Sequence, residues 1–217
     1  MILLALTALA FAKPTHAQIE AASWSKVSDR NTDTGTVTVY SATIAGMGCV
    51  RGTASTPVPP STLLTVATDV PSAIRWSTAG LTKSELLGKS GNTLDYWQYL
   101  DVPGWTMSAD RFWFVRSTVN SDPNDAWEKW DMLDGGGAHT AKYAEVKAAY
   151  PDAVEPTVNI GEWRFKADGS GGSAVQYMVC TDPGGSIPTA IQTAAEQRTL
   201  PDTVADLIRE GRKRAGL

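Results

Sequence analysis

Side chains that could act as a catalytic base are scarce in this chain. Its 217 residues include only two histidines, His16 and His139. A serine-type hydrolase needs a nucleophile, a base that takes its proton and a group that orients the base. His16 lies at the end of an apolar N-terminal stretch, and His139 stands alone in the glycine-rich segment "DGGGAHT". We therefore expect His139 to be a solvated loop residue, and we predict no catalytic residue.

Patterns for metal, nucleotide or nucleic-acid binding are equally weak. One histidine and two distant cysteines, Cys49 and Cys180, do not form a recognised ligand spacing. No glycine-rich loop of the dinucleotide or Walker type precedes a helix. The net charge of -4 gives no electrostatic footprint for nucleic acid, and the one basic cluster, Arg209 to Arg214, lies at the C-terminal end of a predicted helix, where cations complement the helix dipole. We expect no metal, no cofactor and no nucleic-acid partner.

Aromatic side chains are the abundant feature. The chain has eight Trp, six Tyr and four Phe, with "YWQY" at 96–99 and "FWF" at 112–114 on successive predicted strands. Core packing would explain any one of them, but Trp and Tyr combine an apolar body with a polar edge and could together line a pocket. Arg116 follows Phe112 and Phe114 at strand spacing. It is either a charge inside that pocket, which would need an acidic or ligand partner, or a solvated strand residue.

The order of the predicted elements defines the fold class. They are a hairpin (35–57), short helices (60–69 and 71–76), four strands between 84 and 133, a short helix (141–150), two strands (158–168 and 172–181) and a long terminal helix bent at Pro201. Turn signals about every 8–12 residues favour an antiparallel meander over βαβ units. The order predicts a single-domain α+β fold with one antiparallel sheet.

The terminal helix carries a stripe of apolar and mostly small side chains. Ile187, Ala190, Ile191 and Ala194 follow the i, i+3, i+4, i+7 spacing of a buried helix face. A bent sheet that closes over such a face leaves unfilled apolar space. Space of this kind suits an apolar ligand.

The N-terminus predicts export. An apolar run from Ile2 to Ala12 and the segment "THA" indicate a signal peptide at 1–17 with cleavage after Ala17, and the alternative is a buried N-terminal helix. We expect a periplasmic or secreted protein. Export would allow Cys49 and Cys180 to form a disulfide, although we favour two buried free thiols.

Two segments resemble one known family. "YMVCTDPGGSIPTAI", at 177–191, resembles the last strand and helix entry of START domains, the steroidogenic-acute-regulatory-related lipid-transfer family. "DVPGWTMSADRFWFVRS", at 101–117, resembles that family's central stretch, and the resemblance extends from Trp24 to the C-terminus. The family's Arg-Asp order is reversed here as Asp110-Arg111, and Ala190 and Thr193 stand where many members have a bulky aromatic and an Asn. The family's buried ion pair therefore cannot be carried over directly to Asp110 and Arg111. The residues at 190 and 193 also leave the family's ligand shape and head-group recognition unassigned in this chain.

The resemblance implies a helix-grip fold, in which a curved antiparallel sheet wraps a long C-terminal helix and encloses a hydrophobic cavity. It implies one START-like domain at 18–217. Pro183 would end the last strand, and Gly184 and Gly185 would allow the turn into the helix; a positive φ at either would make a Cβ costly. The candidate ligand-binding residues are Trp97, Tyr99, Phe112, Phe114, Arg116, Trp163, Phe165, Tyr177, Ile187, Ile191 and Ala194.

The function implied is that of a non-enzymatic monomeric carrier for one sterol, phospholipid or other lipid, with transient membrane contact. One alternative is an enzyme similar to polyketide cyclases, which would use residues such as Arg116 or Tyr99 to polarise its ligand. The other is a ligand-free interaction domain with a filled core.

Overall fold

The computed structural model describes residues 13–102, 108–182, 184 and 189–217. Within them, nine strands form one antiparallel sheet in the order β1-β2-β3-β9-β8-β7-β6-β5-β4. The strands are β1 (Ser25–Thr32), β2 (Gly35–Ile44), β3 (Met47–Thr56), β4 (Leu81–Ser90), β5 (Thr93–Leu100), β6 (Arg111–Asn120), β7 (Asp125–Met132), β8 (Val158–Ala167) and β9 (Ser173–Asp182). The helices are α1 (His16–Ala21), α2 (Pro60–Thr68), the 3-10 turn η1 (Val70–Ser72), α3 (Ala73–Trp76), α4 (Gly135–Ala138), α5 (Thr140–Ala149) and α6 (Thr189–Ala215).

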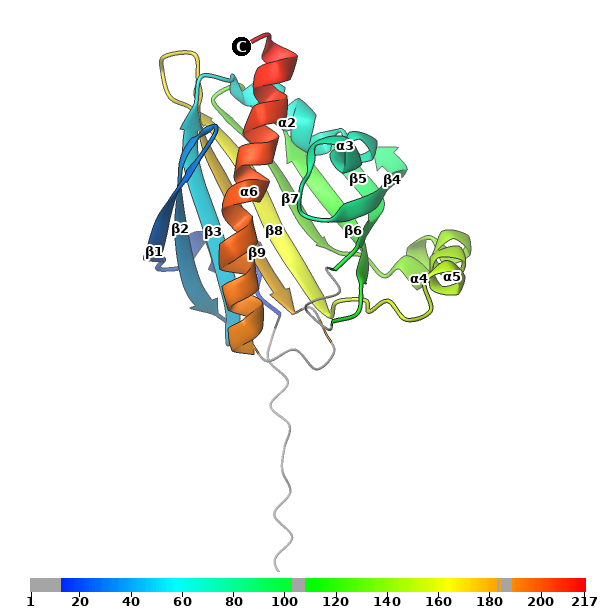
Figure 1. Cartoon of the computed structure of the whole chain (residues 1–217). Coiled ribbons are helices and arrows are strands. Elements are labelled where there is room, and N and C mark those ends of the chain that lie inside the picture. Colours follow the sequence, from blue (N-terminus) through cyan, green and yellow to red (C-terminus); the bar gives the residue numbers. More distant parts are fainter. Residues whose placement is uncertain (1–12, 103–107, 183, 185–188) are drawn as a thin grey trace, which may run out of the picture.

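The sheet curves around α6, which lies across its concave face (Figure 1). In β2, the side chains of Val37 and Val39 alternate with threonines and are fully buried in the core beneath α6. The helix contributes Leu200, Val204, Leu207 and Ile208 to the same core. This arrangement confirms the predicted α+β helix-grip fold.

A glycine sets the distance between α6 and the sheet. A Cβ placed on Gly52 of β3 would lie 2.4 Å from a Leu200 methyl group and 3.1 Å from a Val204 methyl group. Because Gly52 has no side chain, the helix approaches the backbone of β3 directly.

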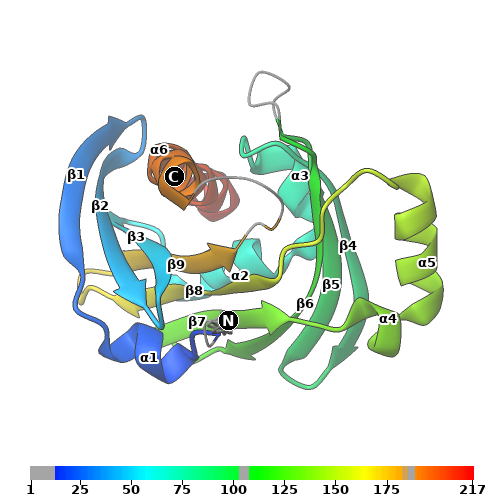
Figure 2. The same cartoon turned by 90° about the horizontal axis from the view of Figure 1, so that it is seen from below.

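On the concave side, α2, η1 and α3 lie beside α6, whereas the convex face carries α1 over the middle of the sheet and α5 beside β5 and β6 (Figure 2). Ile19 of α1 is buried over Cys49 and Cys180. Among the described residues, no helix is long and apolar enough to cross a membrane.

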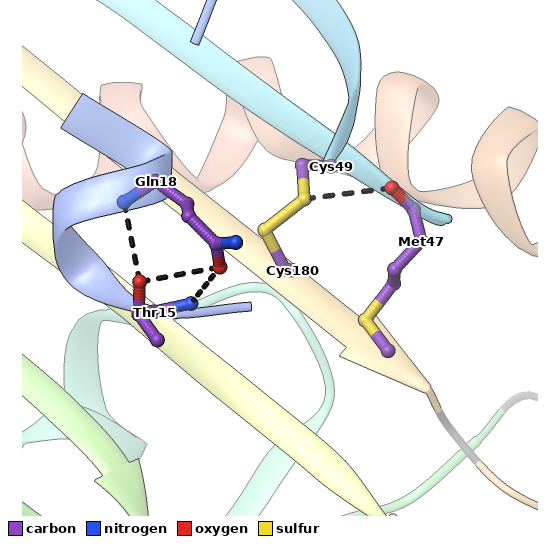
Figure 3. The surroundings of a disulfide bond; sticks show 5 residues. All are labelled: Thr15, Gln18, Met47, Cys49 and Cys180. Atoms are coloured by element: carbon purple, nitrogen blue, oxygen red, sulfur yellow. Dashed lines mark hydrogen bonds between the residues drawn. A yellow bond between two sulfur atoms is a disulfide. The ribbon is translucent and has the colours of Figure 1, made fainter. Parts of the chain in front are cut away.

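Cys49 and Cys180 form a disulfide, so the preference for two free thiols was wrong. The two residues are direct cross-strand partners in β3 and β9, with a Cα–Cα distance of 4.3 Å (Figure 3). Two cysteines 131 residues apart in sequence thereby join the third and fourth strands of the sheet.

Two further local expectations were wrong. The segment "DGGGAHT" contains the short helix α4, whose first turn is capped by Asp134 through the amide of Gly137. His139 is not a solvated loop residue, because its Nε2 lies 3.0 Å from an Asp95 carboxylate oxygen and its side chain is only 22% exposed.

Residues just before the predicted cleavage point take part in the fold. Thr15 caps α1 and forms a capping box with Gln18. Lys13 and His16 both contact the carboxylate of Asp131, at 2.7 and 3.1 Å. Residues 1–12, the main part of the predicted signal peptide, lie outside the described residues.

Candidate ligand cavity

A cavity of about 130 Å³ lies between the concave face of the sheet and the helices. Strands β5 to β9 provide one wall, and α2, η1, α3 and α6 provide the other. The lining includes Tyr96, Gln98, Trp113, Val115, Glu128, Trp130, Asn159, Trp163 and Tyr177 from the sheet, and Ala67, Val70, Ala73, Trp76 and Thr203 from the helices.

Aromatic rings form the sheet-side wall. The ring centroids of Trp163 and Tyr177 are 4.3 Å apart, and those of Trp130 and Tyr177 are 5.9 Å apart. Gly161, between Asn159 and Trp163 on the same face of β8, leaves room for this group, since a Cβ there would lie 2.3 Å from the Trp130 ring. The rings therefore form one packed apolar surface.

Amide side chains satisfy the polar edges of two indoles. Trp130 donates its Nε1–H to Asn159 Oδ1 at 3.0 Å, and Trp113 donates to Gln98 Oε1 at 3.0 Å. These bonds fix the orientation of the two rings. They also leave the indole faces that are not stacked on a neighbouring ring available for contact with an apolar molecule.

One carboxyl group, that of Glu128, lines this apolar cavity. Its side chain is buried, and the burial raises its pKa to about 7. Tyr96 donates its hydroxyl to Glu128 at 3.4 Å, and burial also raises the pKa of Tyr96. A carboxyl group with this pKa can keep or release a proton near neutrality, so it can donate a hydrogen bond to a ligand or accept one.

A second buried polar group lies where β9 leads towards α6. The Arg111 guanidinium donates to the carbonyl of Gly184 at 3.2 Å and also to that of Ala109. Asp110 instead accepts from the Tyr99 hydroxyl and from the Val102 amide, at 2.5 and 2.8 Å. Gly184 has a φ of +67°, which confirms the need for glycine at this joint; Gly185 lies outside the described residues.

The structure separates the predicted site residues by face. Trp163 and Tyr177 line the cavity, and Phe165 lies on the same face beside Trp163, with centroids 6.1 Å apart. Their contact with a ligand stays a prediction. Ile187 lies outside the described residues. Ile191 and Ala194 lie in the first turns of α6, and the side chains of these turns are not described.

The other aromatic candidates lie outside the cavity. Trp97, Tyr99, Phe112 and Phe114 point to the convex face, where they pack with Val146 of α5. Their expected place in the cavity is corrected by the strand register: Trp97 pairs with Phe114 and Tyr99 with Phe112, all four on the outer face.

Arg116 lies on that outer face as well. Its side chain is 52% exposed and forms a bidentate pair with Asp95, with both N–O distances at 2.7 Å. Of the two alternatives for Arg116, a charge inside the pocket or a solvated strand residue, the structure therefore supports the second.

Sequence reasoning did not single out Trp113, Trp130 or Glu128. In "FWF" both faces of the strand carry aromatic rings, so hydrophobicity alone does not show which face is concave. The alternation in "AWEKWDM" could have placed Ala126, Glu128 and Trp130 on one face, although a carboxylate there would suggest solvent.

No protein-family model matches the chain, and no curated protein matches it in sequence. Solved structures do match its fold. Human STARD10 superposes with a TM-score of 0.69 at 15% identity, covering 88% of this chain and 73% of that one. A STAR-related lipid transfer protein from Xanthomonas axonopodis gives 0.69 at 18% identity, covering 87% and 98%. The Zhui aromatase/cyclase from a Streptomyces species gives 0.55 at 12% identity, covering 77% and 94%.

The structures that match over most of the chain include STAR-related lipid transfer domains, and the curved antiparallel sheet around a long C-terminal helix is consistent with their fold. This chain has the helix-grip fold of START domains.

Proposed function

We propose that this chain binds one hydrophobic ligand in the cavity beneath α6 and acts as its carrier. The observation that supports this most is the set of packed indole and phenol rings that line the space between the concave face and the helices. Three of the solved structures with this fold are described as lipid transfer proteins or domains.

The cavity limits the size and chemistry of the ligand. About 130 Å³ is close to an engineered cavity of about 150 Å³ that holds benzene, and it is below the usual range of about 300–1,000 Å³ for ligand pockets. A sterol or phospholipid would therefore have to move the lining side chains apart. Glu128 would bond a hydroxyl, amine or amide group of the ligand in addition to the Tyr96 hydroxyl, because a carboxyl group offers more hydrogen-bonding positions than the one that Tyr96 uses.

Two measurements test the carrier function. Mass spectrometry of organic extracts from natively purified protein should show one recurring class of hydrophobic molecule. Purified protein should also take up a fluorescent sterol or a fluorescent fatty acid in saturable fashion. Protein that is empty and takes up neither probe, nor a labelled phospholipid, would contradict the proposal.

A cavity-filling variant tests the location. Ala67 of α2 lines the cavity, and Ala67→Leu would occupy part of it. We expect at least about tenfold weaker binding, the equivalent of about 1.4 kcal/mol of lost contact or added strain. Ala148→Leu, on the exposed face of α5, is the matched control and should bind like the parent. Equal affinities for the two variants would place the ligand elsewhere.

A second candidate function is a cyclase-like enzyme, and Glu128 is the observation that favours it. Its raised pKa suits proton transfer near neutral pH, with Tyr96 beside it. Arg116 and Tyr99, which the sequence suggested for this role, lie on the outer face. Turnover of a linear polyketide substrate that Glu128→Gln abolishes would establish the enzyme. Binding of the ligand without turnover would instead support the carrier function.

A further inference from the structure

The convex face holds a second and larger hollow, of about 780 Å³. Its floor is formed by β2, β3, β9 and β8, and one wall is formed by α1 and the residues that follow it. The sheet separates this hollow from α6 and from the ligand cavity, because α1 and α6 lie on opposite faces (Figure 2). We refer to it as the outer hollow.

Arg51 is the central cation of the outer hollow. Its guanidinium carbon lies 4.8 Å from the ring centroid of Trp24 and 4.5 Å from that of Tyr40. Its Nε is buried, and no described oxygen accepts a hydrogen bond from this side chain. Burial lowers the pKa of Arg51. A half-buried guanidinium held by two rings but lacking an acceptor is positioned to bind an anion.

Other unmatched polar groups surround Arg51. The indole Nε1 of Trp24 is also buried without an acceptor in the described part of the chain. Lys166 projects from the floor and forms no ion pair with a described residue, while Arg164 is held by Asp125 through two nitrogens. The one carboxylate in the described lining, that of Glu20, is already paired with Lys129. The hollow thus has an excess of positive charge.

The lining can also bind neutral polar groups. Thr53 and Gln176 are cross-strand partners on the floor and offer a hydroxyl and an amide. The volume far exceeds that of a bare ion. Hydroxyl and amide groups beside an indole suit a hydroxylated molecule, which can lie against the ring and bond the floor.

We propose that the outer hollow binds an anionic group, a carboxylate or a phosphate monoester or diester, carried on a hydroxylated body. Arg51 provides the charge-assisted hydrogen bonds, Trp24 provides the wall and its N–H, and Lys166 adds long-range attraction. The source of the anion can be a free sugar phosphate or an anionic lipid headgroup. This site is separate from the cavity of the proposed carrier function.

The test is a binding titration with glucose phosphate as the probe. Binding is measured by calorimetry and by the NMR chemical shift of the Trp24 indole N–H. Trp24→Phe identifies that signal. We expect saturable binding that shifts the indole proton, with unmodified glucose binding at least about tenfold more weakly, because a hydrogen bond to a charged group contributes about 1.5–3 kcal/mol. Vesicles of phosphatidylglycerol and phosphatidylcholine, compared with phosphatidylcholine alone, test the lipid source.

Arg51→Gln is the diagnostic variant, and Arg30→Gln is its matched control. Arg30 is an exposed β1 residue outside the lining of the outer hollow, so both variants remove one positive charge. We expect Arg51→Gln to weaken binding at least about tenfold and Arg30→Gln to change it less than about twofold. Arg51→Gln should melt close to the parent's temperature, since the side chain it removes is half-buried and forms no hydrogen bond with a described residue.

Each outcome decides the proposal. Binding of glucose phosphate that depends on Arg51 supports it with a soluble ligand, and Arg51-dependent binding of phosphatidylglycerol vesicles alone supports it with a lipid headgroup. Equal loss in the two variants, equal binding of glucose and glucose phosphate, or no binding of either probe would overturn it.

Discussion

Glu128→Gln should abolish one specific pH dependence of stability. Burial raises the pKa of Glu128 from an ordinary 4.5 to about 7, so the folded protein keeps this carboxyl protonated where the unfolded chain has already lost the proton. A raised carboxyl pKa means that stability is intact below about pH 4.5 and is lost as the pH rises towards 7. The difference between the two pKa values corresponds to about 3 kcal/mol of unfolding free energy.

Gln keeps the shape of the side chain and an acceptor for Tyr96, but it does not ionise. The unfolding free energy of Glu128→Gln relative to the parent should therefore rise by about 3 kcal/mol between pH 4.5 and pH 8. Urea denaturation at fixed pH values, followed by fluorescence and circular dichroism, measures this difference. Comparing the two proteins at each pH removes the contribution of the other carboxylates.

Glu145→Gln, on the exposed face of α5, provides the control. It should differ from the parent by an amount that stays constant over the same pH range to within about 0.5 kcal/mol. If the Glu128→Gln difference is equally constant, Glu128 ionises in the folded protein as freely as in water. The reasoning from burial would then be refuted.

Three further changes have defined outcomes. Replacing Cys49 and Cys180 together by Ala should lower the unfolding free energy by up to about 5 kcal/mol, which is the loop-entropy value for a sequence separation of 131 residues. A loss below about 1 kcal/mol, measured by urea denaturation, would contradict this. Gly184→Ala, at φ +67°, should lower the unfolding free energy by about 1–2 kcal/mol. Gly88→Ala is the control and should lower it far less, because Gly88 has open space around it and no positive φ. Equal melting temperatures for the two variants would show that the joint is unstrained. If export removes residues 1–17, N-terminal sequencing should find Gln18 as the first residue. Hydrogen exchange in the rest of α1 should then be faster than in the full chain, because the Thr15 cap is lost. An intact Met1 would contradict the export prediction.

The strands and the joint before α6 could be predicted because their signals are local. β-branched and aromatic runs end at glycine, proline or aspartate turns, and the Asp182-Pro183-Gly184 break fixes the end of β9. β1 was not predicted, because "SKVSDRNT" is polar on both faces and pairs with β2 at the edge of the sheet. Such a strand shows no apolar alternation.

The candidate site was predicted less well, because it depends on which face of each strand is concave. A shift of one residue moves every side chain to the other face, and "FWF" and "YWQY" carry rings on both. Only the neighbouring helices decide the matter: α5 covers Phe112 and Phe114, while α2, α3 and α6 leave space over Trp113. The disulfide was missed for a similar reason, since it depends on strand order and not on spacing along the chain.

The pairing of β3 with β9 inside the sheet has a consequence for how the protein folds. The strands that join the two halves of the sheet are separated by 131 residues at the disulfide, so the sheet stays in two pieces until β9 has been synthesised. Contacts of such long range are slow to form, and domains dominated by non-local strand pairing fold over milliseconds to seconds. During that time the inner edge of β3 exposes unpaired backbone groups beside Val50 and invites pairing with another chain. Ribosome-bound or truncated chains that end before Ser173 should therefore require a chaperone, whereas the complete chain protects this edge by itself.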